Sequence, residues 1–175
     1  MGLLRRERGD DGPSAGSRYQ MRQRLLSIGD DYWIEDEQGR RAFRVDGKAL
    51  RVRKTFVLED ASGNEVAKIQ ERKLSVRDKM AIERGGDSLA TVRKALVGIR
   101  DRFSIDVAGG GELHAKGNIV DHEYEIERDG RAVATVSKRW FAVRDSYGVA
   151  IAPDEDDALV LAITVCIDTL SHPRD

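Results

Sequence analysis

The sequence predicts a mainly β protein, in which a closed barrel of about twelve strands in hairpin repeats surrounds a buried hydrophobic C-terminal α-helix. Three observations lead to this prediction. A strand-turn-strand pattern recurs along the chain, no proline occurs between Pro13 and Pro153, and an acidic segment near the C-terminus is followed by an apolar one. Because proline interrupts strand pairing, a long stretch without it favours a sheet of many strands.

One barrel domain is expected between two short tails. Residues 1–17 are rich in glycine, serine and charged residues, a composition typical of a disordered tail. The barrel domain is expected over residues 18–171, and residues 172–175 form the second tail. The first tail lacks the apolar core of a secretory signal, and no apolar run is long enough to span a bilayer. We therefore expect a cytoplasmic protein.

Each repeat begins with a short apolar segment that ends in glutamate. The copies of this segment are residues 32–35, 56–59, 80–83 and 124–127. Each copy is followed by a glycine turn, at Gly39, Gly63, Gly85 with Gly86, and Gly130. A second apolar segment follows each turn, at residues 42–45, 66–69, 89–92 and 133–136. This order is typical of a β-hairpin that the chain uses four times.

Alternation of apolar and polar residues predicts the remaining strands. Phe103, Ile105 and Val107 alternate with polar residues, and the glutamates of residues 123–127 alternate with apolar ones. A period of two places one set inside the barrel and the other in water. Further strands are expected at residues 20–28, 112–119 and 147–152, with a turn at residues 108–111. A glycine run can also cradle phosphate, but the lysine and serine of a P-loop do not follow this one.

The last segment predicts a helix over residues 154–170. Its start is acidic, at residues 154–157, and carboxylates there cap free N–H groups and suit the helix dipole. Residues 158–167 are apolar on every side of a helix, which must then be buried on every side. The helix would be roughly 25 Å long, a length that a closed barrel can surround. Small residues of the repeats would leave it room: Ala42, Ala67, Ala81, Ala90, Ala134 and Ala150.

Composition narrows the classes of function. The formal net charge is −1 although 35% of the residues are charged, whereas a general nucleic-acid binder carries a basic excess. The lone Cys166 excludes an internal disulfide and a multi-cysteine metal site, and its place in the apolar helix indicates packing rather than reactivity. No nucleophile-elbow, dinucleotide-binding or zinc-helix motif occurs. We therefore expect a protein that is not an enzyme, has no cofactor and binds no nucleic acid.

The hairpins and the acidic cap before a terminal apolar helix resemble the LURP-one-related family. This family belongs to the tubby C-terminal-like superfamily, which also includes the phospholipid scramblases. The most telling segments are residues 21–31, 65–82 (with 73–79 inside them) and 156–168, and the resemblance covers residues 19–170. It implies a closed twelve-stranded barrel around a hydrophobic helix. In the same superfamily, tubby proteins bind phosphoinositide head groups through basic side chains on the barrel, and scramblases respond to calcium.

Four clusters of arginine and lysine follow the second strands of the hairpins. They are Arg51, Arg53 and Lys54; Lys68, Arg72, Lys73, Arg77 and Lys79; Arg93, Lys94, Arg100 and Arg102; and Lys138, Arg139 and Arg144. A regular arrangement of the hairpins would bring some clusters together at one rim or face, where convergent donors could bind a phosphate. The candidate residues for an anionic head group are Lys68, Arg72, Lys73, Arg77, Lys79, Arg93 and Lys94. The alternative is a solvated surface that nearby carboxylates balance.

Three other groups have a structural and a functional interpretation. The acidic residues 154–157 could bind calcium, but they lack the spaced ligands of a calcium loop, which favours helix capping. Asp121, His122 and Glu123 are metal-ligand types, but alternation on a strand separates them and favours an exposed polar strand. The aromatic residues Trp33, Trp140 and Phe141 are expected to pack in the core or on the barrel rather than contact a membrane.

Two functions from different classes remain. The first is a non-enzymatic binding or scaffold module that binds anionic phospholipid head groups at the membrane periphery through its Arg/Lys clusters. The second is a protein–protein interaction module without a lipid ligand, which would use exposed strand edges or acidic stretches. An enzyme with an unrecognised site is the third, and it would need a cleft of convergent polar groups with perturbed pKa values.

Overall fold

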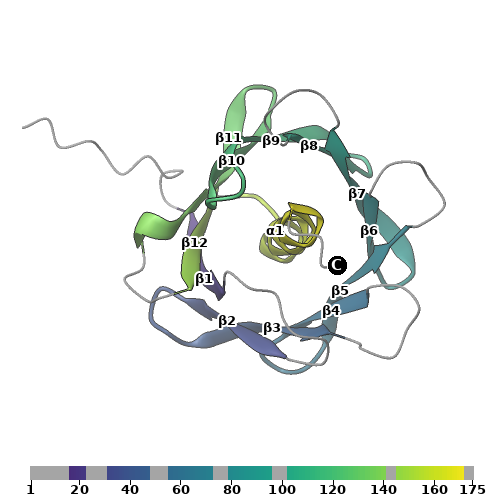
Figure 1. The fold of residues 1–175 in the computed structure, drawn as a ribbon. Helices are drawn as coiled ribbons and strands as arrows, with labels where there is room; N and C mark the ends of the chain where they lie inside the picture. The colour runs from purple at the N-terminus through teal and green to yellow at the C-terminus, as the bar shows by residue number, and fades with distance from the viewer. Residues whose placement is uncertain are drawn as a thin grey trace, which may run out of the picture.

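The computed structural model describes residues 16–22, 31–47, 55–72, 79–95, 102–140 and 145–171, which form a closed antiparallel barrel around one helix (Figure 1). The strands are β1 (Ser17–Arg22), β2 (Tyr32–Asp36), β3 (Arg41–Gly47), β4 (Thr55–Asp60), β5 (Glu65–Glu71), β6 (Lys79–Arg84), β7 (Asp87–Ala95), β8 (Arg102–Val107), β9 (Gly111–Asn118), β10 (Glu123–Arg128), β11 (Arg131–Ser137) and β12 (Ser146–Ile151). Each strand pairs with its neighbours in sequence, and β1 closes the barrel by pairing with both β2 and β12. The predicted fold class is confirmed.

The repeated hairpins carry a β-bulge at the same point. The register shifts at the step from an apolar residue to glutamate, between residues 34 and 35, 58 and 59, 82 and 83, and 126 and 127. A bulge bends its strand and increases the local twist. Closing a sheet into a barrel needs both changes. The glutamate that ends each sequence repeat therefore marks a bend that helps the barrel to close.

Aspartates organise the tight turns that follow two of these bulges. Asp60 accepts hydrogen bonds from the backbone N–H groups of Ser62 and Asn64, both at 2.9 Å, and Gly63 takes the left-handed φ of 85° that the turn requires. Hydrogen bonds from the side chain and backbone of Asn64 hold the pKa of Asp60 below its ordinary value. Asp36 occupies the equivalent place between β2 and β3.

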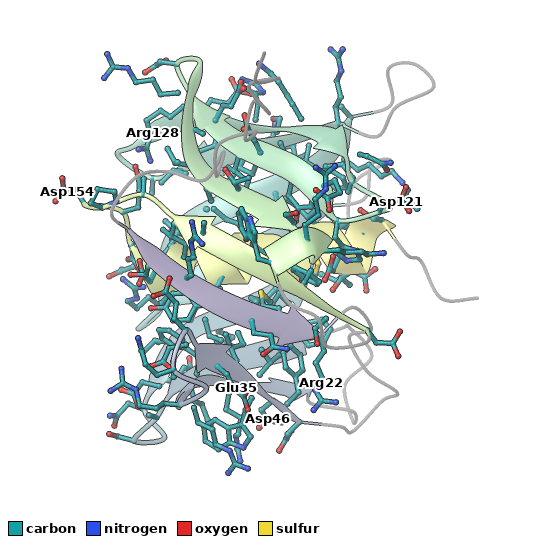
Figure 2. The ribbon with its side chains drawn as sticks, turned by 90° about the vertical axis from the view of Figure 1, so that its left-hand side faces the viewer. Arg22, Glu35, Asp46, Asp121, Arg128 and Asp154 are labelled. Atoms are coloured by element: carbon teal, nitrogen blue, oxygen red, sulfur yellow. The ribbon has the colours of Figure 1, made fainter. Side chains whose placement is uncertain are left out.

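The barrel has two different ends. At one end, which we call the turn end, odd-numbered strands begin and even-numbered strands finish. The tight turns after β2, β4, β6, β8 and β10 lie at this end. We call the opposite end, where odd-numbered strands finish, the loop end. In the side view of Figure 2, Arg128 and Asp154 mark the turn end, and Arg22 and Asp121 mark the loop end. The helix α1 (Asp157–Ser171) starts at the turn end and finishes at the loop end.

α1 lies along the middle of the barrel (Figure 1), and every residue from 160 to 168 is buried. Its core partners include Ile34, Leu58, Ile69 and Ile126, which have no exposed surface. The predicted helix boundaries, 154–170, are shifted, because residues 154–156 form a turn before the helix. Burial of an apolar side chain stabilises by roughly 1.5–3 kcal/mol, so the apolar helix is a major part of the core.

The small residues divide between the two faces of the barrel wall. The expectation that they leave room for the helix holds for Ala67, Ala90 and Ala134, which belong to the core. It is wrong for Ala42, Ala81 and Ala150, which lie outside the core cluster. Alternation is the reason: Met80 and Ile82 face α1, so the residue between them faces outward.

The strand expected at residues 20–28 is β1, which begins at Ser17. Residues 23–28 lie outside the described residues. The predicted tails at residues 1–17 and 172–175 stay predictions, because residues 1–15 and 172–175 are also outside.

Candidate functional site

Basic side chains gather on the outer face of β5–β8, toward the loop end. Strand register places Lys79 directly opposite Arg93, and the backbone N–H of Arg72 donates to the carbonyl of Lys79 at 3.0 Å. Arg102 lies opposite Ala95, two residues beyond Arg93 on the same face of β7. With Lys68 on β5, these residues form a surface that we call the basic strip: Lys68, Arg72, Lys79, Arg93 and Arg102.

Two carboxylates on the same face pair with the basic strip. Arg72 Nη2 lies 2.9 Å from Glu83 Oε1, and Arg93 Nη2 lies 2.8 Å from Asp106 Oδ2. Both pairs are substantially exposed, so each is worth about 0–1 kcal/mol. Within the described part of the chain, no ion pair involves Lys68, Lys79 or Arg102. The strip therefore presents an excess of positive charge.

The like charges of Lys79 and Arg93 stand opposite each other on neighbouring strands. Directly opposed like charges destabilise a sheet by some tenths of a kcal/mol. An anion held between them would relieve this repulsion, and arginine can offer it a bidentate fork. This arrangement is therefore suited to a phosphate or another anionic group.

Not every predicted cluster joins the strip. Alternation places Lys94 on the same side of β7 as the core residue Val92, opposite to Arg93. Lys138 and Arg139 lie in the short helix η1 (Lys138–Trp140), which packs on β12 on the far side of the barrel from β5–β8 (Figure 1). The other predicted basic residues lie outside the described residues: Arg51, Arg53, Lys54, Lys73, Arg77, Arg100 and Arg144.

The acidic segment before α1 fastens the helix to the barrel at the turn end. Asp156 caps the helix by accepting a hydrogen bond from the backbone N–H of Leu159 at 3.1 Å, which confirms the capping prediction. Arg84 of β6 donates hydrogen bonds to both oxygens of the same carboxylate, from Nη1 at 2.8 Å and from Nη2 at 3.2 Å. Desolvation acts to raise the pKa of Asp156, but the hydrogen bonds from Arg84 and Leu159 outweigh it and hold that pKa below its ordinary value.

Two more strands hold the start of the helix. Arg128 of β10 donates to Glu155 at 2.6 Å, and the hydroxyl of Tyr19 on β1 donates to Asp157 at 2.5 Å. Burial, and then the hydrogen bond to Asp157, raise the pKa of Tyr19 well above its usual value. Among the described residues, no group of three or more histidine, cysteine or acidic side chains is placed to hold a metal ion. Glu155, Asp156 and Asp157 are therefore engaged in fastening the helix.

His122 overturns the expectation of an exposed polar strand. It belongs to the turn between β9 and β10, it is 2% exposed, and its φ of 54° is left-handed. A left-handed residue redirects the chain, so the alternation of a strand does not apply to its side chain. Its Nε2 lies 2.8 Å from Asp168 Oδ1, and its ring stacks on that of Tyr147 with 4.3 Å between centroids.

Asp168 is the centre of a buried polar cluster near the end of α1. The hydroxyl of Tyr147 donates to Asp168 Oδ2 at 2.5 Å, so each carboxylate oxygen has its own partner. Tyr32 and Tyr124 lie close enough that, after burial itself, the charge of Asp168 is the main cause of their raised pKa values. We call these residues the Asp168 cluster: Tyr32, His122, Tyr124, Tyr147 and Asp168.

The Asp168 cluster has polar groups typical of catalytic sites, but it is shut off from solvent. The side chains of His122 and Asp168 are 3% and 4% exposed. Removing one partner of a buried hydrogen bond leaves the other unsatisfied, which costs about 1–3 kcal/mol. In this structure the cluster therefore serves to anchor the helix. The sequence prediction did not identify it, because it depends on three strands and a helix meeting at one end of the barrel.

The aromatic residues on the outer face lie under arginines. Arg41 stacks over Trp33 at 4.9 Å, and Arg18 stacks over Trp140 at 5.2 Å. Neither tryptophan belongs to the core, so the expectation of core packing is wrong and that of packing on the barrel holds. Phe141 lies outside the described residues. Cys166 has no exposed surface, and burial raises the pKa of its thiol. No helix in the described part of the chain has the length and apolar character needed to cross a membrane.

Comparisons with known proteins give a family, a sequence relative and a structure of similar fold. The model of a family described as LURP-one-related matches residues 17–168. The chain is 26% identical over 152 residues to the uncharacterized protein YxjI of Bacillus subtilis (strain 168), a match that covers 87% of this chain and 92% of that protein. An X-ray structure of a protein from Arabidopsis thaliana is similar with a TM-score of 0.66, at 18% identity, over 90% of this chain and 94% of the other. At that identity the structural likeness shows a shared fold.

Proposed function

Because the chain belongs to the LURP-one-related family, we propose that it is a non-enzymatic binding module, and that its basic strip binds anionic phospholipid head groups at a membrane surface. One observation carries the proposal. Strand register places Lys79 opposite Arg93, with Arg72 and Arg102 nearby. Among the described residues, two carboxylates form ion pairs with the five cations of the strip. Anionic phosphates would accept hydrogen bonds from the basic groups that these carboxylates leave unpaired.

The energy of such binding fits a peripheral contact. Each lysine or arginine near an anionic bilayer contributes about 1 kcal/mol, and the attraction falls off within a Debye length. Lys68, Lys79 and Arg102, which have no ion pair among the described residues, would therefore contribute about 3 kcal/mol together, enough for a salt-sensitive and reversible association. The paired arginines would add to it where an anion outcompetes Glu83 or Asp106.

A protein partner is the alternative occupant. The closed order of the barrel leaves every described strand with two neighbours, so a partner peptide would not find a free strand edge. Such a partner would have to recognise side chains on the outer face. The lipid proposal is favoured because the excess charge lies on adjacent positions of one face.

Vesicle sedimentation tests the proposal with a matched pair of variants. The strip variant combines Lys68→Ala, Lys79→Ala and Arg102→Ala. The three side chains that it removes have no carboxylate partner in the described part of the chain. The control combines Lys116→Ala, Arg131→Ala and Arg139→Ala, which removes the same charge from exposed positions off the strip. Phosphatidylcholine vesicles with and without phosphatidylserine or phosphoinositides are compared at low salt.

We expect the strip variant to bind anionic vesicles about 100-fold more weakly than the wild type, from about 1 kcal/mol for each of its cations. The control should lose much less. Equal losses in the two variants would mean that bulk charge rather than the strip attracts the vesicles. Failure of the wild type to bind any anionic vesicle, together with a stoichiometric protein partner, would replace the lipid proposal by the protein one.

A further inference from the structure

Charge is unevenly distributed along the axis of the barrel. The connections at the turn end, counted with the strand or helix residues that border them, hold ten acidic and five basic residues, over residues 36–41, 60–65, 84–87, 107–111, 128–131 and 151–157. Several of these carboxylates are exposed, among them Glu65, Asp87 and Asp154. The dipole of α1 opposes this charge by only about half an elementary charge at each end. The turn end is therefore negative, whereas the basic strip lies toward the loop end.

An apolar side chain is exposed at the loop end, in the turn between β9 and β10. Val120 is 54% exposed, and it is the one large hydrophobic side chain of the described residues that is so exposed. Before this turn begins, β9 continues from Ala115, which is paired with Phe103, to Asn118. The turn therefore reaches past the start of β8, where Arg102 of the basic strip lies.

The turn presents Val120 on a rigid base. Ile119 before it and His122 after it are each 2% exposed, and His122 hydrogen-bonds to the last part of α1. The backbone N–H of His122 donates to the carbonyl of Ile119 at 3.1 Å, which closes the turn. The amide of Asn118 donates to the carboxylate of Asp121 at 2.6 Å. An apolar group that is already held in place loses little conformational entropy when it is bound.

We propose that the protein docks on an anionic bilayer in one orientation, in which the β9–β10 turn enters the head-group layer at Val120 and the turn end points into the water. This orientation rests on the lipid binding proposed above, to which it adds a direction and a depth. A single exposed apolar residue is common on a protein surface, but this one lies beside the cations that would draw the bilayer close. The exposed carboxylate of Asp121 confines the turn to the head-group layer, because a charge in hydrocarbon is costly.

An anionic surface would select this orientation over the reverse one. It attracts the basic strip and repels the exposed carboxylates of the turn end. Figure 2 shows Asp121 of the β9–β10 turn and Asp154 of the turn end at opposite ends of the barrel. The fifteen residues of α1, which runs between these ends, span roughly 22 Å, whereas the field of a charged surface decays within about 8 Å at physiological salt. A bilayer at the loop end would therefore act on the strip and hardly on the turn end.

Fluorescent labels at the two ends of the barrel test the orientation. Val120→Cys and Asp87→Cys each add one exposed thiol for an environment-sensitive dye, whereas the natural Cys166 has no exposed surface. Each labelled full-length protein is mixed at low salt with phosphatidylcholine vesicles that contain phosphatidylserine, and sedimentation of the same samples measures binding. We expect the emission of the dye at position 120 to shift to the blue and to be quenched by lipids with a quencher near the head group. The dye at position 87 should keep its emission.

The outcomes separate the orientation from the lipid binding on which it rests. If the vesicles sediment the protein and the two dyes respond equally, or neither responds, the orientation is rejected and the lipid binding stands. If anionic vesicles do not sediment the wild type, both are rejected.

A pair of unlabelled variants tests the role of Val120 without a dye that could itself enter the bilayer. Val120→Ser removes apolar surface and should bind anionic vesicles about 5-fold more weakly than the wild type. Val120→Leu keeps an apolar side chain at the same place and should bind at least as tightly as the wild type. Equal affinities of the two variants would mean that Val120 stays in water, and the proposed orientation would be rejected.

Discussion

The two ends of α1 are fastened by different chemistry. At the turn end, Arg84 forms an ion pair with Asp156 and Arg128 forms one with Glu155, and both carboxylates are partly exposed. At the loop end, Asp168 is buried and bonds to His122 and Tyr147. Water screens the first set and is excluded from the second, so each interaction at the loop end should count for more.

The ends also differ in what they offer to a partner. Several carboxylates at the turn end accept hydrogen bonds from backbone N–H groups or from arginines, among them Asp36, Asp60 and Asp156. Toward the loop end of β5–β8, the basic strip keeps cations without partners in the described part of the protein. The surface charges of these turn-end residues are thus used within the fold, whereas the basic strip carries cations with no ion pair among the described residues, as the lipid proposal requires.

The largest expected effect is at the centre of the buried cluster. Asp168→Ala removes the buried carboxylate that His122 and Tyr147 share, and we expect the free energy of unfolding to fall by about 2–5 kcal/mol, from about 1–3 kcal/mol for each group left unsatisfied. Urea denaturation measures this value. The corresponding change at the turn end, Asp157→Ala, removes one part-buried hydrogen bond and should cost about 1 kcal/mol. A similar cost for both substitutions would contradict the distinction between the two ends.

A second prediction concerns the glycine that lets β9 approach β10 near the loop end. Gly117 has a φ of 132°, and a Cβ there would lie 2.7 Å from the carbonyl oxygen of Glu123. Gly117→Ala should therefore cost roughly 1–3 kcal/mol in unfolding free energy, from backbone strain together with the clash. Gly39→Ala is the turn-end control, because its φ is also left-handed but a Cβ would meet nothing within 4 Å. Equal losses would show that the close approach is unimportant.

Removing the Arg84 side chain at the turn end should lower the free energy of unfolding by less. Arg84→Ala breaks the exposed pair with Asp156 and a hydrogen bond to the carbonyl of Val66. We expect a loss of about 1 kcal/mol that shrinks at high salt, because the pair is screened. Denaturation at low and high ionic strength measures it. A loss that is independent of salt would indicate that packing of the arginine stem, not its charge, fastens the helix.

The smallest expected effect is the pH dependence of the turns. The folded pKa of Asp60 lies below its usual value of about 4, so the ionised carboxylate stabilises the fold above that pH. This contribution is lost as the pH falls through the folded pKa. Asp60→Asn keeps an acceptor but has no charge to lose. The midpoint difference between the wild type and this variant should narrow on going from about pH 6 to pH 3. A constant difference would contradict the role of the charge.

Much of the fold could be predicted because its signals are local. The apolar–glutamate segments, their glycine turns and the period-two alternation each arise within a few residues, and the structure has the hairpins where they were expected. The burial of α1 could be predicted because residues 158–167 are apolar on every face. The position of the small residues could not be judged by size alone, since alternation sends Ala81 and Ala150 outward.

The Asp168 cluster was missed because it depends on closure of the barrel. His122 enters the interior through a left-handed φ that strand alternation does not anticipate. Two signals could have pointed to it. Asp168 is the one carboxylate of α1 beyond its first residue, in a largely apolar segment, and buried charges require partners. Tyr32 and Tyr124 open apolar–glutamate segments, at corresponding places of two repeats, which places both at the same end of the barrel.

Salt titration of vesicle binding tests the proposed role of the loop end most directly. We predict that the wild type and the Lys116→Ala, Arg131→Ala, Arg139→Ala control both bind anionic vesicles at low salt and both weaken steeply as salt is added. The Lys68→Ala, Lys79→Ala, Arg102→Ala variant should bind about 100-fold more weakly at low salt and respond little to further salt. Parallel curves of equal affinity for the two triple variants would contradict the assignment of binding to the basic strip.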